Sequence, residues 1–213
     1  MRTEDLIAQL AGQMQPVPQH AAVRRLCAAL ALGGLVSFIA ILAGPGLRPD
    51  FVEASRTAPF WMKWVFTLSV VWAAIVVVRR LGDPDGRVGL VWLALATPFA
   101  VVAMMAVGEI MAASAPARVG LFFGHTASRC SLAIIGLSVP VFVGCLIAFR
   151  RFAPTRLRLA GAAVGVLSGA AGAAVYAFAC AEASAAFMIT WYTAGILAAG
   201  GLGALVGPRV LRW

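Results

Sequence analysis

The sequence is poor in charge, and above all in acidic residues. Only 12% of its 213 residues are charged, about half of the ~25% found in an ordinary soluble domain. Hydrophobic residues make up 62%. A soluble protein of this length cannot bury so much apolar surface, whereas a lipid bilayer can solvate it. The composition therefore excludes an ordinary soluble domain and predicts an integral membrane protein.

Motifs for enzymatic chemistry are also lacking. The chain has no Ser–His–Asp pattern, no phosphate-binding glycine loop and no zinc-protease motif. No carboxylate or histidine falls inside an apolar run, and Glu109 lies only near the end of one, although proton-coupled pumps and transporters need such a group near the midplane. We therefore expect no enzyme activity and no cofactor. The net charge of +9 does not indicate nucleic-acid binding, because the basic residues form short clusters between apolar runs.

Six apolar runs are present, each bounded by charge, Pro or Gly. They cover residues 26–43, 59–78, 88–107, 130–149, 159–180 and 185–206. Each is about 20 residues long, which suits a bilayer core of about 30 Å. The first run lacks a small-residue cleavage site, so we expect it to remain as a helix. The predicted fold is all-α, a bundle of six transmembrane helices, with kinks at Pro98 and Pro140 and segment 116–126 along the outer interface.

Lys and Arg are distributed unevenly over the loops. Twelve of the 17 lie on the side that holds both termini and four lie on the other side, while Lys63 stands just inside the second run. Cytoplasmic loops carry the excess of Lys and Arg. This distribution predicts a bacterial inner-membrane protein with both termini in the cytoplasm. Because Lys63 is close to Trp61 and Trp64, we expect it to reach the outer interface within an aromatic belt rather than to be buried.

Glycine recurs at four-residue spacing in the last two runs. The fifth run carries Gly161, Gly165 and Gly169, and the sixth carries Gly203 and Gly207. Such small faces let helix backbones approach closely. With the short link around Glu182, they predict that the last two helices are antiparallel neighbours. A homo-oligomer formed through these faces is a weaker alternative.

The four cysteines fall at two depths. Cys27 and Cys145 lie near the predicted cytoplasmic side, a reducing compartment, and we expect both to be packing residues. Cys130 opens the fourth run and Cys180 closes the fifth. These two helices run antiparallel from a short link, and each spans about 30 Å. Both thiols therefore reach the same outer edge, where disulfides can form.

The residues alone leave several interpretations of this outer pair open. It could be a structural disulfide, a redox switch, a metal site, or two inert cysteines too far apart to interact. Glu109, His125 and Glu182 lie in the same outer layer, and thiolate with imidazole suits soft or borderline cations. However, no C-x-x-C or H-x-x-H spacing supports a metal site.

The first 22 residues form a separate unit ahead of the membrane domain at 23–213. Thr3 is a favourable N-cap, Glu4 and Asp5 suit a first helical turn, and Leu6, Ile7 and Leu10 form an apolar stripe. A helix this short is marginal in water, so we expect it to order on a partner or on the bilayer. Its acidic polar face favours a basic protein partner over a lipid surface. An unstructured leader is the alternative.

Several local patterns match one known family. They are Thr3-Glu4-Asp5-Leu6-Ile7 with Pro16-Val17, Gly124 before Arg129-Cys130, the Pro154-Thr155 link, Tyr176, Cys180, Glu182, Trp191-Tyr192, and the ending Leu211-Arg212-Trp213. Over essentially its whole length the chain resembles the NrsF-type membrane anti-sigma factors, negative regulators of an extracytoplasmic-function (ECF) sigma factor.

The resemblance implies a function for two regions. It implies that the cytoplasmic tail, through Thr3, Glu4, Asp5, Leu6, Ile7 and Leu10, holds the sigma factor away from core RNA polymerase. It also implies that Cys130 and Cys180 take part in sensing heavy-metal or oxidative stress. The family pattern has a His before the second cysteine and a Pro after it, whereas this chain has Ala179 and Ala181, which weakens a metal-ligand role relative to a thiol role. The alternatives from other classes are a small transporter or channel and a quinone-coupled membrane thiol oxidoreductase.

Overall fold

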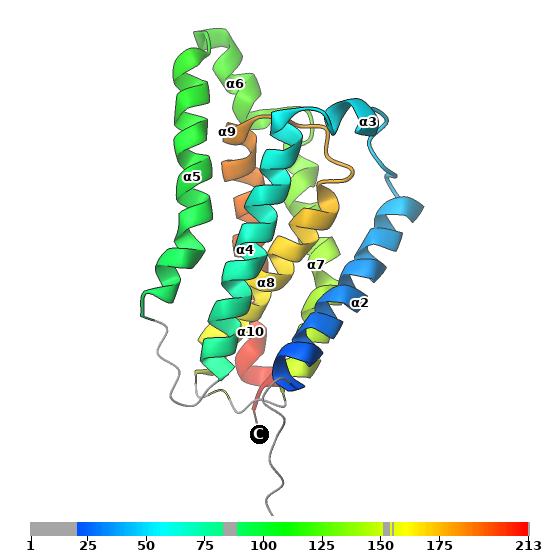
Figure 1. Ribbon diagram of the computed structural model, residues 1–213, viewed down its shortest axis with the longest axis vertical. Helices are drawn as coiled ribbons and strands as arrows, with labels where there is room; N and C mark the ends of the chain where they lie inside the picture. Colours follow the sequence, from blue (N-terminus) through cyan, green and yellow to red (C-terminus); the bar gives the residue numbers. More distant parts are fainter. Residues whose placement is uncertain (1–20, 83–88, 151–153, 155, 213) are drawn as a thin grey trace, which may run out of the picture.

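The computed structural model describes residues 21–82, 89–150, 154 and 156–212. Within these ranges the chain is helical and contains no strand. The long helices are α2 (Ala21–Ala43), α4 (Ala58–Gly82), α5 (Val91–Ala112), α7 (Ala127–Phe149), α8 (Leu157–Tyr176) and α10 (Thr193–Val210). The short helices α3 (Phe51–Ala54), α6 (Ala115–Phe123) and α9 (Ala185–Phe187) lie together at one end of the bundle, and a π-helical turn, η1 (Met188–Tyr192), joins α9 to α10 (Figure 1).

Six helical segments are long and apolar enough to cross a membrane, as predicted. Two boundaries differ from the prediction. The third helix, α5, continues beyond residue 107 to Ala112 because its one carboxylate, Glu109, finds hydrogen-bond partners at the start of α9. The fifth helix, α8, ends at Tyr176, so Cys180 lies in the link after the helix rather than at its end. Helices α5 and α7 continue through Pro98 and Pro140.

Helix α8 is the centre of the bundle and contacts α10, α7, α4 and α2. Its glycine face explains the close approach of α10. A Cβ atom at Gly161 would collide with the carbonyl oxygen of Gly203, and one at Gly165 would collide with that of Ala199. Since later positions on α8 meet earlier positions on α10, the two helices run antiparallel, which confirms the prediction from the glycine spacing.

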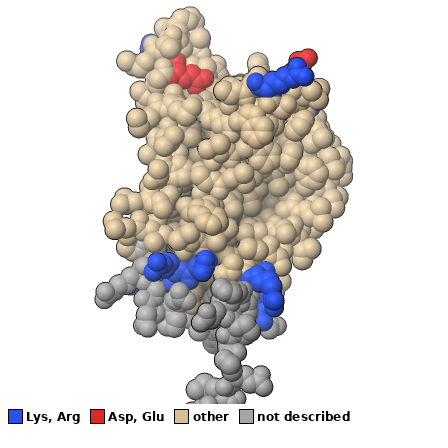
Figure 2. Space-filling view, in the orientation of Figure 1, with Lys and Arg blue, Asp and Glu red and all other residues tan. Residues whose placement is uncertain are grey.

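The charged residues divide the bundle into two ends (Figure 2). We call the end where α2 and α8 begin and α4, α7 and α10 finish the arginine-rich end. We call the opposite end, with α3, α6 and α9, the acid-bearing end. The described acidic residues all belong to the latter; they are Asp50, Glu53, Glu109 and Glu182. Helix α6, within the segment predicted to lie along the interface, has no buried residue and exposes Val119 and Phe123.

Candidate functional site

The two outer cysteines lie in one buried cluster at the acid-bearing end. Cys130 is in the first turn of α7, and Cys180 is in the link after α8. Both side chains are fully or almost fully buried and share an apolar core with Tyr176 and Tyr192. The Cys130 thiol lies within electrostatic reach of the Cys180 thiol and of the Lys63 ammonium. Neither cysteine is in a disulfide bond, so the arrangement places two free thiols in one buried cluster.

Lys63 is the most unexpected member of this site. Its side chain is 1% exposed, and its Nζ donates a hydrogen bond of 2.9 Å to the carbonyl oxygen of Cys180. The prediction that it reaches the interface is therefore wrong. On α4, Lys63 shares its helical face with the buried Phe60 and Val70, whereas Trp61 points outward. The non-helical link leaves the Cys180 carbonyl without a helical donor, and the long lysine side chain supplies one.

A second cation, Arg48, holds the same link. Its backbone N–H donates to the carbonyl of Phe178 (3.1 Å), and its Nη1 donates to the carbonyl of Cys180 (3.4 Å). The guanidinium also forms a salt bridge of 2.7 Å with Asp50. This hydrogen-bonded pairing lowers the pKa of the Asp50 carboxyl and raises that of Arg48. Two cations from different elements thus converge on one carbonyl group.

Glu182 connects the link to the start of α7. Its Oε1 accepts hydrogen bonds from the backbone N–H of His125 (2.7 Å) and the hydroxyl of Thr126 (3.2 Å). Gly124 has a φ of 50°, and a Cβ atom there would lie 2.5 Å from the Glu182 carboxylate. The glycine is therefore needed both for its backbone conformation and for space. These contacts fix the turn that leads to Cys130.

Glu109 secures the other side of the link. Its Oε2 accepts hydrogen bonds from the Ser184 hydroxyl (2.8 Å) and from the backbone N–H of Ala186 (3.1 Å). The Ser184 side chain also caps α9. Glu109, His125 and Glu182 thus lie at the same end as the cysteines, as predicted. Among the described residues, however, no group of three or more His, Cys, Asp or Glu side chains is placed to hold a metal ion.

Phe178 carries the link into the aromatic packing around α2, α3 and α4. Its ring centroid lies 4.6 Å from that of Trp64, 5.0 Å from that of Phe38 and 6.0 Å from that of Phe51. Phe38 belongs to α2, the helix that follows the amino-terminal tail. The residue two positions before Cys180 is therefore in direct contact with α2.

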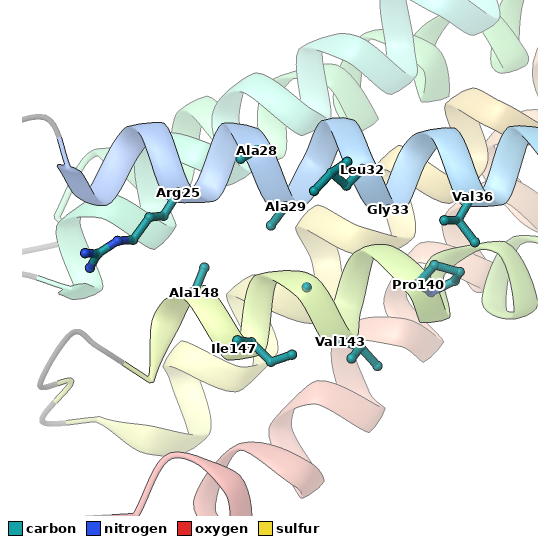
Figure 3. Close-up of a pocket in the computed structure, with 11 residues that line it drawn as sticks. Arg25, Ala28, Ala29, Leu32, Gly33, Val36, Pro140, Val143, Ile147 and Ala148 are labelled. Carbon is teal, nitrogen blue, oxygen red and sulfur yellow. The ribbon is translucent and has the colours of Figure 1, made fainter.

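Helix α2 is attached to the bundle mainly through α7. The Ser37 hydroxyl donates to the carbonyl oxygen of Leu137 (2.7 Å), and a Cβ atom at Gly33 would lie 2.6 Å from the Cα of Val141. The same two helices line an apolar groove of about 600 Å³ that runs from Gly33 and Pro140 to Arg25 (Figure 3).

The other two cysteines lie far from this site. Cys145 is buried on α7, as expected for a packing residue, but Cys27 is exposed on α2, so the same expectation for Cys27 is wrong. Helix α2 contacts its neighbours on one face only, and Cys27 lies on the other. The residues predicted to bind a partner, Thr3, Glu4, Asp5, Leu6, Ile7 and Leu10, lie outside the described residues.

Sequence reasoning missed Lys63 and Arg48 as parts of the cysteine site. For Lys63 a signal was available, because its spacing from Phe60 and Val70 puts it on the apolar face of its helix. Arg48 offered no comparable signal, since it lies in a short loop whose course depends on tertiary contacts.

Comparison with known proteins supports one family over nearly the whole chain. The model of the family described as "Negative regulator of sigma F" (NrsF) matches residues 10–213. The chain is 37% identical over 213 residues to the "Probable anti-sigma-F factor NrsF" of Azospira oryzae. It is 34% identical over 214 residues to the "Anti-sigma-F factor NrsF" of Caulobacter vibrioides. In both cases 100% of each chain is covered, while no solved structure is significantly similar. The chain therefore belongs to the NrsF family of negative regulators of sigma F.

Proposed function

We propose that this chain is a membrane-bound anti-sigma factor that holds an ECF sigma factor at the bacterial inner membrane. The observation that carries the proposal is the full-length identity to two relatives named as anti-sigma-F factors. Six helices long enough to span a bilayer and the excess of Lys and Arg on the side of both termini support an inner-membrane location with both termini cytoplasmic.

The sigma-binding element in this proposal is the tail of residues 1–22, ahead of the sensor domain at 23–213. Leu6, Ile7 and Leu10 would enter an apolar groove on the sigma factor, while Glu4 and Asp5, after the N-cap Thr3, would meet its basic rim. The protein acts by sequestration rather than catalysis. A sigma factor bound in this way is kept from core RNA polymerase.

The sensing element in this proposal is the pair Cys130 and Cys180. Reaction of these thiols with a soft metal cation or an oxidant would place new bulk and polarity in a dry, close-packed cluster. Because both side chains are buried, the reagent reaches them only when the link around Cys180 opens. The hydrogen bonds from Lys63 and Arg48 to the link therefore set how readily the sensor responds.

Two routes lead from this cluster to the tail, and both pass through α2. One runs along α7, whose first turn holds Cys130 and whose middle contacts α2 at Gly33 and Ser37. The other runs from Cys180 through Phe178 to Phe38. Since α2 directly follows the tail in the sequence, a shift of either contact would change how the tail is presented to the sigma factor. A signal weakens sigma binding only if the two states of the cluster favour different positions of α2.

Co-purification from gently solubilised native membranes tests the proposed function. Full-length protein is compared with a variant lacking residues 2–15, and bound proteins are identified by mass spectrometry. We expect a sigma factor with the full-length protein only. Recovery with both forms would move the contact to the cytoplasmic loops, and recovery with neither would contradict the anti-sigma function. Reporter fusions at residue 213 and in the 177–184 link test the topology, with cytoplasmic and periplasmic activity expected respectively.

A further inference from the structure

The arginine-rich end contains a cavity that the proposed function does not use. It lies between the start of α8 and the end of α10 and has a volume of about 450 Å³. We call it the arginine pocket, and its lining residues are Arg158, Ala204, Leu205, Pro208, Arg209 and Arg212. Three arginines therefore line one hollow: Arg158 at the start of α8, Arg209 in the last turn of α10, and Arg212 just after it.

Among the described residues, the charge around this pocket is positive only. None of its lining residues is acidic, and all described carboxylates lie at the acid-bearing end (Figure 2). The Arg209 side chain folds back along α10, where its Nη1 donates to the carbonyl oxygen of Leu205 (3.0 Å). This bond uses one of five N–H donors of the guanidinium. The pocket is thus suited to an anion that accepts several hydrogen bonds, as a phosphate group does.

The pocket continues into an exposed apolar face. Leu205 in its wall is 65% exposed, and Leu202 and Leu197 on the same helix are exposed as well. Leu202 stands three residues before Leu205 on the same side of α10, so the apolar face extends from the arginines toward the middle of the helix. A ligand that fits both parts has an anionic head and a hydrocarbon chain. A soluble acidic protein would leave the leucine face uncovered.

We propose that the arginine pocket binds the phosphate of an anionic phospholipid, whose acyl chains lie along Leu205 and Leu202. Basic pockets between membrane helices are known to take such head groups. The proposal requires only that the chain resides in a bilayer, so it stands or falls separately from sigma-factor binding. In this proposal Arg158, Arg209 and Arg212 bind the phosphate ester of the lipid.

The test uses the full chain purified in mild detergent, with two double variants of equal charge change. R158Q/R209Q removes two pocket arginines, and R79Q/R80Q removes two exposed arginines at the end of α4. Retained phosphatidylglycerol is counted by native mass spectrometry, with phosphatidylcholine as the neutral lipid. We expect the wild type and R79Q/R80Q to retain phosphatidylglycerol selectively, and R158Q/R209Q to retain at least about tenfold less, the effect of losing one or two charge-assisted hydrogen bonds.

A further variant and a second ligand make the outcome decisive. R158K/R209K keeps the charge, so recovery of most of the lipid by this variant shows that the loss in R158Q/R209Q does not come from misfolding. Equal retention by all variants, or equal loss in both glutamine variants, would overturn the proposal. Millimolar inorganic phosphate that displaces the lipid completely and stabilises the protein equally would identify a small-anion site instead. A glutamine variant that keeps its lipid but loses a co-purified acidic protein would identify a protein-docking site, and would also overturn the proposal.

Discussion

The ammonium group of Lys63 lies 2.9 Å from the carbonyl oxygen of Cys180 and is shielded from solvent. A buried cation is costly unless it is paired or hydrogen-bonded. Among the described residues the structure shows no salt bridge to Lys63, so the link that carries Cys180 supplies its compensation. This relationship couples the position of Cys180 to a residue more than a hundred positions earlier in the chain.

Replacing Lys63 with Met is expected to loosen the link around Cys180. The variant loses a charge-assisted hydrogen bond, worth about 1.5–3 kcal/mol, while the side chain keeps a similar length. In a C27S background, which removes the exposed thiol, we expect the rate of maleimide labelling at Cys180 to rise about tenfold or more. The labelled cysteine is identified by peptide mass spectrometry.

The matched control for this variant is R56M. Arg56 is an exposed cation at the same end of the bundle, and its side chain makes no hydrogen bond to the link. Its replacement should leave the labelling rate unchanged. Equal labelling of wild type and K63M would show that Lys63 does not hold the link closed.

Gly165→Ala is expected to destabilise the bundle by about 1–3 kcal/mol, the usual cost of overpacking. The added methyl group would collide with the carbonyl oxygen of Ala199 on α10. The matched control is Gly201→Ala on α10 itself, where no atom lies within 4 Å of the new Cβ position. Thermal unfolding in detergent should show a lower midpoint for G165A only. A midpoint for G165A at or above that of G201A would contradict the close packing of α8 against α10.

Gly33→Ala tests the contact between α2 and α7. Its methyl group would lie 2.6 Å from the Cα of Val141, so α2 has to move away from α7. The adjacent Gly34→Ala is an unusually close control, since nothing lies within 4 Å of that position. With a sigma-dependent reporter, we expect G33A to change basal output or its response to signal several-fold, and G34A to behave as wild type. Identical behaviour of both variants would remove α7 from the proposed route to the tail.

Gly124→Ala tests the turn that precedes Cys130. A residue with a side chain costs about 1–3 kcal/mol in the backbone conformation of Gly124, and its methyl group would also displace the Glu182 carboxylate. Gly120→Ala, in the neighbouring α6, meets no atom within 4 Å. We expect faster thiol labelling at Cys130 in G124A than in G120A. No difference between the two would show that the Glu182 contacts do not shield this cysteine.

Much of the fold follows from simple patterns in the sequence. Run lengths near the thickness of a bilayer predict six helices, and glycine spacing predicts that α8 and α10 pack against each other. The same patterns do not predict which side of a helix faces its neighbours. Lys63 faces inward on α4 while Trp61 faces outward. The spacing of Lys63 from Phe60 and Val70 indicates this direction, but the mean hydropathy of the run does not.

The candidate site, like the fold, could be predicted from the sequence only in part. Helix lengths predict that Cys130 and Cys180 reach one edge of the bundle, because each residue of a helix adds a fixed rise along the helix axis. Their burial in one cluster depends on the course of a non-helical link. This link is held by Arg48, Lys63 and Glu109 from three separate segments, and its own Glu182 accepts a hydrogen bond from His125. Long-range contacts of this kind leave no local pattern in the sequence.

The most direct test of the account measures sigma-factor binding before and after thiol modification. Full-length protein in nanodiscs is titrated with its purified sigma factor, with and without a thiol-reactive metal or oxidant. The account predicts that treatment weakens binding at least about tenfold in the wild type, and that C130S and C180S each largely abolish this change while binding normally when untreated. Undiminished weakening in both single variants would contradict sensing at these cysteines, and an absence of binding by untreated wild type would contradict the anti-sigma function itself.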